Sequence, residues 1–231
     1  MKAVILAGGL GSRLRPFTEV IPKPLLPFGE RSIMETQILT LKSFGVTDVY
    51  IATNYKSDYV EAFIGDGSKY GVRLHFSKEK EPLGTCGPLA LLKEEFAEPF
   101  IVLNGDILTK MSFSDFYAFA IKHNSVLTVA TKIITTPFRF GNVSVDSNDH
   151  IIDVDEKPEL KMEIVAGIYC MTPGIFEFIP TGEYYNMDAL IKELLKTNIP
   201  IARYLIQDYW IDIGQVDDYS KAQEIYAKHF S

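Results

Sequence analysis

Short apolar runs rich in β-branched residues alternate with longer amphipathic segments along this chain. The apolar runs predict strands at Ala3–Ala7, Val49–Thr53, Arg73–Ser77, Phe100–Asn104 and Leu127–Lys132. The amphipathic segments predict helices at Ile33–Phe44, Tyr59–Ile64, Pro88–Glu95, Phe113–His123, Met187–Leu195 and Asp217–Lys228. Strands and helices that alternate at this spacing are typical of a mostly parallel sheet covered by helices on both faces. We therefore predict an α/β fold and one domain over residues 1–231.

The segment from Phe140 to Glu156 departs from this alternation. Two short runs flank the turn-forming triplet Ser147–Asn148–Asp149, a pattern that predicts a β-hairpin inserted into the α/β fold. Elsewhere, glycine or polar residues follow the predicted strands. Gly8 follows the first strand, Asn54 the second and Asp106 the fourth. Ligands of such sheets bind beyond the carboxyl ends of the strands, so we expect the site there.

A glycine turn opens the segment AGGLGSRLRPFTEVIPKPLLPFG, residues 7–29. Its three glycines allow positive φ and let consecutive N–H groups approach an anion. The spacing fits neither the dinucleotide fingerprint nor the Walker A loop. Four prolines oppose a long helix, so we predict an extended loop that holds Arg13 and Lys23 over the turn to grip a polyphosphate. The alternative is an ordinary βα turn with solvated basic residues.

Charge supports a small anionic ligand rather than a polymer. The net charge is -7, which disfavours nucleic acid and anionic membranes as partners. Residues 1–31 hold five basic and two acidic side chains, whereas the other 200 residues hold 18 basic and 28 acidic ones. No apolar run approaches the length of a membrane span, and the run at the start is too short for a signal peptide. Cys86 and Cys170 form no disulfide framework, so we expect a cytoplasmic protein.

The glycine segment resembles the signature loop of the sugar-1-phosphate nucleotidylyltransferases. Further matches recur along the chain at EPLGTCGPLAL (81–91), LNGDI (103–107), FGNVSVD (140–146), EKP (156–158), AGIY (166–169) and WIDIGQVDDY (210–219). The PLGTCGPLAL stretch looks most like mannose-1-phosphate guanylyltransferases, in a short form that lacks a C-terminal β-helix. The resemblance implies a Rossmann-like three-layer sandwich in which the hairpin helps to bind the sugar.

The resemblance also implies residue roles. Arg13, Lys23, Asp106 and Asp212 are the expected catalytic residues, and the two aspartates are the expected ligands of Mg²⁺. The nucleotide is expected to contact Leu6, Ala7, Gly8, Gly9, Gly11, Ser12, Arg13, Lys23, Glu79, Pro82, Gly84, Thr85 and Asn104. The sugar phosphate is expected to contact Asn142, Glu156, Lys157 and Gly167. Arg15 lies outside these positions and is interpreted as a solvated or steering charge.

The implied reaction transfers a nucleoside monophosphate from a nucleoside triphosphate to a sugar-1-phosphate of mannose, heptose or amino-sugar type, with release of pyrophosphate. Guanine is the expected base, because the acceptor-only carboxylate of Glu79 suits its two adjacent donors. A uridylyl- or thymidylyltransferase of the same family remains an alternative, as does a catalytically silent nucleotide-sugar sensor. A nicotinamide-dependent Rossmann enzyme is disfavoured by the glycine spacing. The resemblance also allows a homodimer.

Overall fold

A seven-stranded mixed sheet forms the centre of the protein, in the order β12-β8-β11-β6-β1-β4-β5. The computed structural model describes residues 1–229. The five predicted strands are confirmed, and the sheet consists of β1 (Lys2–Leu6), β4 (Asp48–Thr53), β5 (Arg73–Lys78), β6 (Phe100–Asn104), β8 (Leu127–Pro137), β11 (Glu159–Met171) and β12 (Ile201–Leu205). β1, β4, β5 and β6 are parallel, whereas β11 runs antiparallel to both of its neighbours.

Helices cover both faces of the sheet, so the predicted α/β sandwich is confirmed. The helices are α1 (Phe17–Val20), α2 (Ile33–Ser43), α3 (Ser57–Ile64), α4 (Phe113–His123), α5 (Met187–Lys196) and α6 (Val216–His229). Alternate residues of β1 feed two separate cores. Ile5 packs into the core that contains Ile38 of α2, whereas Val4 packs into the core that contains Leu190 of α5. This alternation follows from the period of two along a strand.

Two local predictions are wrong. The segment Gly87–Glu95 forms 3₁₀ turns rather than an α-helix, with Pro88 within its first turn. Residues 7–29 are not an extended loop, because they contain the 3₁₀ turns Ser12–Leu14 and Lys23–Leu25 with α1 between them. The prolines there shorten these helical turns instead of extending the chain. Leu14, Leu25 and Leu26 anchor the turns by burial.

Short strand pairs lie beside the main sheet. β2 (Pro27–Phe28) pairs with β3 (Arg31–Ser32), and β7 (Ile107–Thr109) pairs antiparallel with β13 (Trp210–Asp212). α2 begins at a capping box, in which the Ser32 hydroxyl accepts from the backbone of Glu35 and the Glu35 carboxylate accepts from the backbone of Ser32. The β7–β13 pair matters most for the site, because it joins segments that lie a hundred residues apart.

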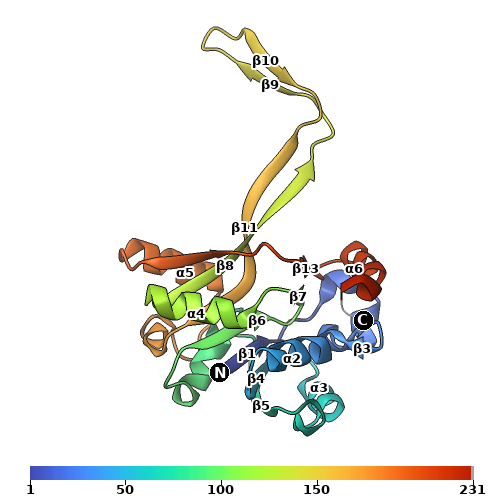
Figure 1. Ribbon diagram of the computed structural model, residues 1–231, viewed down its shortest axis with the longest axis vertical. Coiled ribbons are helices and arrows are strands. Elements are labelled where there is room, and N and C mark those ends of the chain that lie inside the picture. Colours follow the sequence, from blue (N-terminus) through green and yellow to red (C-terminus); the bar gives the residue numbers. More distant parts are fainter. Residues whose placement is uncertain (230–231) are drawn as a thin grey trace.

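The predicted hairpin is confirmed, with β9 (Asn142–Val145) paired to β10 (Ile151–Asp155) around the turn at residues 146–150. β8 and β11 continue beyond the sheet as a two-stranded ribbon that carries this hairpin away from the rest of the molecule (Figure 1). In the described part of the chain, no helix has both the length and the apolar character needed to cross a membrane.

Candidate active site

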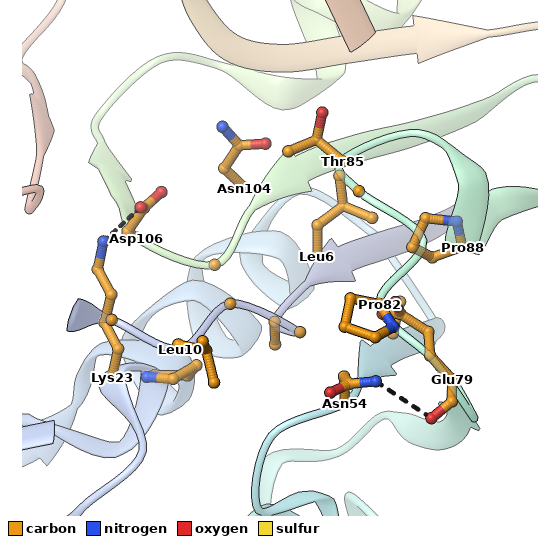
Figure 2. Close-up of a pocket in the computed structure, with 18 of the residues that line it drawn as sticks. Leu6, Leu10, Lys23, Asn54, Glu79, Pro82, Thr85, Pro88, Asn104 and Asp106 are labelled. Atoms are coloured by element: carbon orange, nitrogen blue, oxygen red, sulfur yellow. Dashed lines mark hydrogen bonds and ion pairs between the residues drawn. The ribbon is translucent and has the colours of Figure 1, made fainter. Parts of the chain in front are cut away.

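A cavity of about 420 Å³ opens at the carboxyl ends of β1, β4 and β6. All thirteen residues predicted to contact the nucleotide line it, together with Asp106. Figure 2 shows Lys23 and Asp106 at one end of the cavity, and Asn54, Glu79 and Pro82 at the other. The structure thus gathers around one cavity the residues that lie in three separate sequence motifs.

Lys23 and Asp106 form an ion pair at the charged end of the cavity. The Lys23 Nζ–Asp106 Oδ2 distance is 2.5 Å, and the Lys23 side chain is only 12% exposed. Asp106 lies in the turn between β6 and β7. The buried side-chain amide of Gln37, on α2, donates to the carbonyl oxygens of Asn104 (2.9 Å) and Ile107 (2.8 Å). These two hydrogen bonds hold both ends of the turn in place. Within residues 1–229, the buried Oδ1 atom of Asp106 has no hydrogen-bond partner.

Asp212 is brought beside Asp106 by the β7–β13 pair. Asp212 is opposite Ile107 in the ladder, and the N–H of Ile213 donates to the carbonyl oxygen of Asp106 at 3.0 Å. Loss of hydration, together with the nearby Asp106 carboxylate, raises the pKa of Asp212 to about 6, although Lys23 and Arg13 partly oppose the shift. Two carboxylates are therefore held close together, and Asp212 is ionised less readily than an ordinary aspartate.

The glycine turn lines the same cavity as Asp106. Gly11 adopts a φ of 62°, and a Cβ atom there would lie 2.9 Å from the side chain of Thr18. The Thr18 hydroxyl donates to the Gly11 carbonyl oxygen at 2.8 Å, which holds the turn in place. At Gly8, a Cβ atom would lie 2.6 Å from Oε1 of Glu79. Gly11 is thus required by its backbone conformation, whereas the close contact at Gly8 is with the end of the Glu79 side chain.

The loop at the other end of the cavity is fixed by contacts with α5. Gly84 has a φ of 79° and leaves no room for a Cβ atom beside Tyr185 and Asn186. The Thr85 hydroxyl accepts from the N–H of Met187 at 2.9 Å. One oxygen of Glu79, Oε2, accepts from the N–H of Leu83 at 2.9 Å, and burial raises the pKa of the Glu79 carboxyl. Glu79 therefore orders the loop and also faces the cavity.

Three residues predicted to contact the sugar phosphate lie away from the cavity. Asn142, Glu156 and Lys157 are exposed and belong to the segment carried outward by β8 and β11 (Figure 1). The structure does not bring these three residues to the nucleotide cavity, because the outer part of the β8–β11 ladder directs them outward, and their predicted contacts with the sugar phosphate stay predictions. Gly167 is different. It lies at the base of the ribbon, where a Cβ atom would meet Nδ2 of Asn104 at 2.7 Å.

Several residues of the site were not predicted from the sequence. Tyr184 and Asn186 line the cavity, but they come from a segment without a recognisable motif. Gly214 also lines it and lies within the WIDIGQVDDY motif, where no role was assigned to it. Asn54 lines it too, and the polar end of β4 was the signal that pointed to it. Gln37 supports the Asp106 turn from within a helix and carries no sequence signal of its own.

The raised pKa of Asp212 leads to a prediction about stability. The folded protein holds the Asp212 proton more tightly than the unfolded chain, whose carboxyl has the ordinary pKa of 3.8. The ionised carboxylate therefore lowers the stability above pH 6, and this cost disappears as the pH falls through 6 towards 4. Asp212→Asn is expected to raise the melting temperature at pH 8 and to leave it nearly unchanged at pH 4, measured without divalent cations.

The matched control for this measurement is Asp188→Asn. Lys192 lowers the pKa of Asp188, so removal of this charge is expected to reduce the melting temperature at pH 8. A lower melting temperature for Asp212→Asn at pH 8 would contradict the assigned electrostatics.

Comparisons with known proteins agree with the site. Residues 2–229 match the family model described as nucleotidyl transferase. The chain is 35% identical over 231 residues to the mannose-1-phosphate guanyltransferase of Schizosaccharomyces pombe, covering 95% of this chain and 62% of that protein. It is 36% identical over 229 residues to mannose-1-phosphate guanyltransferase beta-B of Xenopus laevis, with the same two coverages. The chain thus spans less than two thirds of the length of these relatives.

A solved structure shares the fold over nearly the whole of both chains. HddC from Yersinia pseudotuberculosis, complexed with GMP-PN, superposes with a TM-score of 0.77 at 27% identity, covering 97% of this chain and 99% of that one. The match over residues 2–229 agrees with the fold and with the cavity at the strand ends. The chain therefore belongs to the nucleotidyl transferase family.

Proposed function

We propose that this protein transfers GMP from GTP to a sugar-1-phosphate and releases pyrophosphate. The observation that carries the proposal is the charged end of the cavity, where Lys23 and Asp106 lie beside the glycine turn and Asp212 lies next to Asp106. The named activity of the Schizosaccharomyces pombe and Xenopus laevis relatives supports it. The 420 Å³ cavity is also of the size expected for a small-molecule site.

In the proposed reaction, an oxygen of the sugar phosphate attacks the α-phosphorus of the triphosphate. A bond forms between that oxygen and the α-phosphorus, the bond from the α-phosphorus to the bridging oxygen breaks, and pyrophosphate leaves with the electron pair. Such transfer depends mainly on alignment and on neutralisation of the growing negative charge. Arg13 and Lys23 are the cationic side chains that line the cavity, so we assign them this role.

The paired carboxylates fit a divalent cation. Asp106 pairs with Lys23 through Oδ2, but its buried Oδ1 has no hydrogen-bond partner within residues 1–229. Loss of hydration and the charge of Asp106 raise the pKa of Asp212, which a bound cation would offset. Within residues 1–229, no group of three or more His, Cys, Asp or Glu side chains is placed to hold a metal. Two carboxylates completed by phosphate oxygens and water suit Mg²⁺, which we propose as the cofactor. When bound, Mg²⁺ supplies positive charge that offsets the charge of the phosphates.

Glu79 is the residue that we propose to recognise guanine. Its carboxyl group lines the end of the cavity away from Lys23 and Asp106, and its Oε2 atom already accepts from the backbone N–H of Leu83. The carboxylate is acceptor-only when ionised, so its free lone pairs suit the adjacent N1–H and amine donors of guanine. The similar Yersinia pseudotuberculosis HddC was solved complexed with GMP-PN, which supports a guanine nucleotide.

The Glu79→Gln variant tests this assignment. A glutamine oxygen can still accept from Leu83, so the loop is expected to remain folded, whereas its amide adds donors that oppose the donors of guanine. We expect the preference for GTP over UTP and dTTP to fall by about 10- to 100-fold, because an unpaired buried polar group costs about 1–3 kcal/mol. The measurement is competition between equimolar GTP, UTP, dTTP, CTP and ATP. An unchanged ranking would remove Glu79 from base recognition.

The proposed function itself is tested by a matrix of nucleoside triphosphates against sugar-1-phosphates, with pyrophosphate release as the readout. Mannose, heptose and amino-sugar phosphates are included, because the residues that line the cavity do not distinguish among them. We expect release only when both substrates are present, with GTP as the best nucleotide. If a triphosphate binds and no sugar phosphate supports pyrophosphate release, the protein is a nucleotide sensor instead.

A further inference from the structure

A third and smaller hydrophobic core lies outside the two cores that flank β1. Its buried members are Leu14, Leu26, Phe28, Ile33, Leu108, Ile213 and Ala222. Each of the four residues to which we assign the phosphates or the cation lies within three positions of one of these members. The pairs are Arg13 with Leu14, Lys23 with Leu26, Asp106 with Leu108 and Asp212 with Ile213. The third core therefore joins the four segments that carry these residues.

The third core supports Asp212 more closely than it supports Asp106. Asp212 is flanked by Ile211 and Ile213, which both pack in the third core. Asp106 precedes Ile107, which belongs to the larger core on the α2 side of the sheet, so Asp106 has an anchor outside the third core. Loosening of the third core is therefore expected to move Asp212 away from Asp106 while the turn that carries Asp106 stays in place.

The helix α6 contributes to the third core with one of its faces. Ala222 is its buried member, and Tyr219 and Tyr226 pack against the same core. Together with Gln223, these residues are spaced three or four positions apart, so they share one face of the helix. Figure 1 shows α6, in red, beside N-terminal segments of the chain, in blue.

The same face of α6 holds the end of the glycine segment. The Tyr219 hydroxyl donates to the carbonyl oxygen of Pro27 at 2.7 Å, and the side-chain amide of Gln223 donates to the same oxygen. Oε1 of Gln223 accepts from the N–H of Gly29 at 3.3 Å. Gly29 has a φ of 60°, and a Cβ atom there would lie 2.2 Å from the ring of Tyr226. The helix therefore packs directly on the main chain of the glycine segment.

α6 is also joined directly to the strand that carries Asp212. β13 ends at Asp212 and the helix begins at Val216, where the Asp218 carboxylate accepts from the N–H of Gln215 at 3.0 Å. β13 has only three residues, and a strand pair of this length is marginal by itself. The contacts of α6 add a second link, because they hold the segment after Asp212 on the segment that carries Lys23.

We propose that Tyr219 and Gln223 are positioning residues, which hold α6 on the glycine segment and thereby set the affinity of the Asp106–Asp212 pair for a divalent cation. The inference rests on the proposed function for its ligand, because the cation is the one that we assign to the transfer reaction. A cation that contacts both carboxylates binds the docked form of α6 better than the undocked form. By reciprocity, the cation stabilises docking as much as docking strengthens cation binding.

Hydrogen exchange tests this coupling in the wild-type protein, with Mn²⁺ as the probe. Amides of α6 exchange when the helix leaves its site, so a cation that binds only the docked form slows their exchange. At ten times the Kd of Mn²⁺, measured by electron paramagnetic resonance, we expect exchange in α6 to slow about tenfold. The amides of α5 are the internal control and are expected to be unchanged. Unchanged exchange in α6, or equal slowing in Asp212→Asn, overturns the proposal.

The role of the two side chains is tested with Tyr219→Phe, alone and combined with Gln223→Leu. These substitutions remove one or both donors to Pro27 and nearly keep the size of each side chain. We expect the Kd of Mn²⁺ to rise about threefold in the single variant and about tenfold in the double variant, because hydrogen bonds of the docked form are lost. Tyr117→Phe is the matched control. The Tyr117 hydroxyl donates to the carbonyl oxygen of Pro99 at 3.1 Å, and its ring packs against the larger core on the α2 side.

Melting temperatures separate positioning from a general loss of stability. Tyr219→Phe and Tyr117→Phe each remove one hydrogen bond to a proline carbonyl oxygen, so we expect a similar small decrease in melting temperature for both. Only Tyr219→Phe is expected to weaken the binding of Mn²⁺. An unchanged Kd of Mn²⁺ in both the single and the double variant, or an equal rise in Tyr117→Phe, overturns the proposal.

The outcomes also separate the inference from the proposed function. A wild-type protein that binds no Mn²⁺ counts against the cation site and against this inference together. Coupling between Mn²⁺ and α6 in a protein that releases no pyrophosphate supports the inference and counts against the transferase reaction. Binding of Mn²⁺ and release of pyrophosphate without coupling to α6 have the opposite meaning.

Discussion

The Asp212→Asn variant is expected to keep its fold and to lose turnover by about 100- to 1000-fold. Asp212 and Asp106 are held together by the β7–β13 pair, and we propose that they share the cation that offsets the phosphate charge. A neutral amide binds such a cation more weakly. The same substitution removes a carboxylate whose ionisation is unfavourable in the folded protein, so this variant should be more stable at pH 8 and less active. Such a trade-off between stability and activity is typical of functional sites.

The control for Asp212→Asn is Asp208→Asn, four residues earlier in the same segment, where the side chain is exposed. We expect it to retain the wild-type rate. A folded Asp212→Asn variant with a near-normal rate, or full activity of the wild-type protein in excess EDTA, would contradict the proposed cation site.

The second large effect is expected at Arg13. Arg13 and Arg15 lie two residues apart and are both exposed, but only Arg13 lines the cavity. Arg13→Met is expected to reduce kcat/KM for the triphosphate by about 100-fold, because a cation that meets the transferring phosphates stabilises the transition state. Arg15→Met removes the same charge from the neighbouring surface and is expected to change kcat/KM less than about twofold at physiological salt. Steady-state kinetics of the pair provide the comparison.

Equal losses of kcat/KM in the two arginine variants would mean that the basic segment acts only through long-range electrostatic attraction of the triphosphate. In that case both losses should shrink as salt is raised, since exposed charges are screened. A loss at Arg13 that persists at high salt supports direct contact with the phosphates.

Much of the cavity could be predicted from the sequence because its residues lie in short, continuous motifs next to β-branched strands. The glycine turn after β1 and the aspartate after β6 are examples, since each is placed by a strand with a clear apolar pattern. The parallel part of the sheet then brings these strand ends to one edge. In this part of the chain, the apolar pattern of each strand is enough to locate the residues that follow it in the folded protein.

Other features depend on contacts that have no local signature. The strands β7 and β13 have three residues each, too few for a periodic pattern, yet they bring Asp106 and Asp212 together. Gln37 looks like an ordinary helical residue, and its two hydrogen bonds to the Asp106 turn appear only after folding. The hairpin was predicted, but the length of the β8–β11 ribbon that carries it was not, because it depends on how far the ladder continues beyond the sheet.

The most direct test of the central claim is to identify and quantify the products. The wild-type protein is incubated with GTP, Mg²⁺ and each sugar-1-phosphate, and the products are measured by mass spectrometry and phosphorus NMR. The account predicts a GDP-linked sugar and pyrophosphate in a one-to-one ratio, and loss of both with Asp106→Asn. Release of orthophosphate and GDP instead, or the absence of a nucleotide-sugar with every pair of substrates, would contradict it.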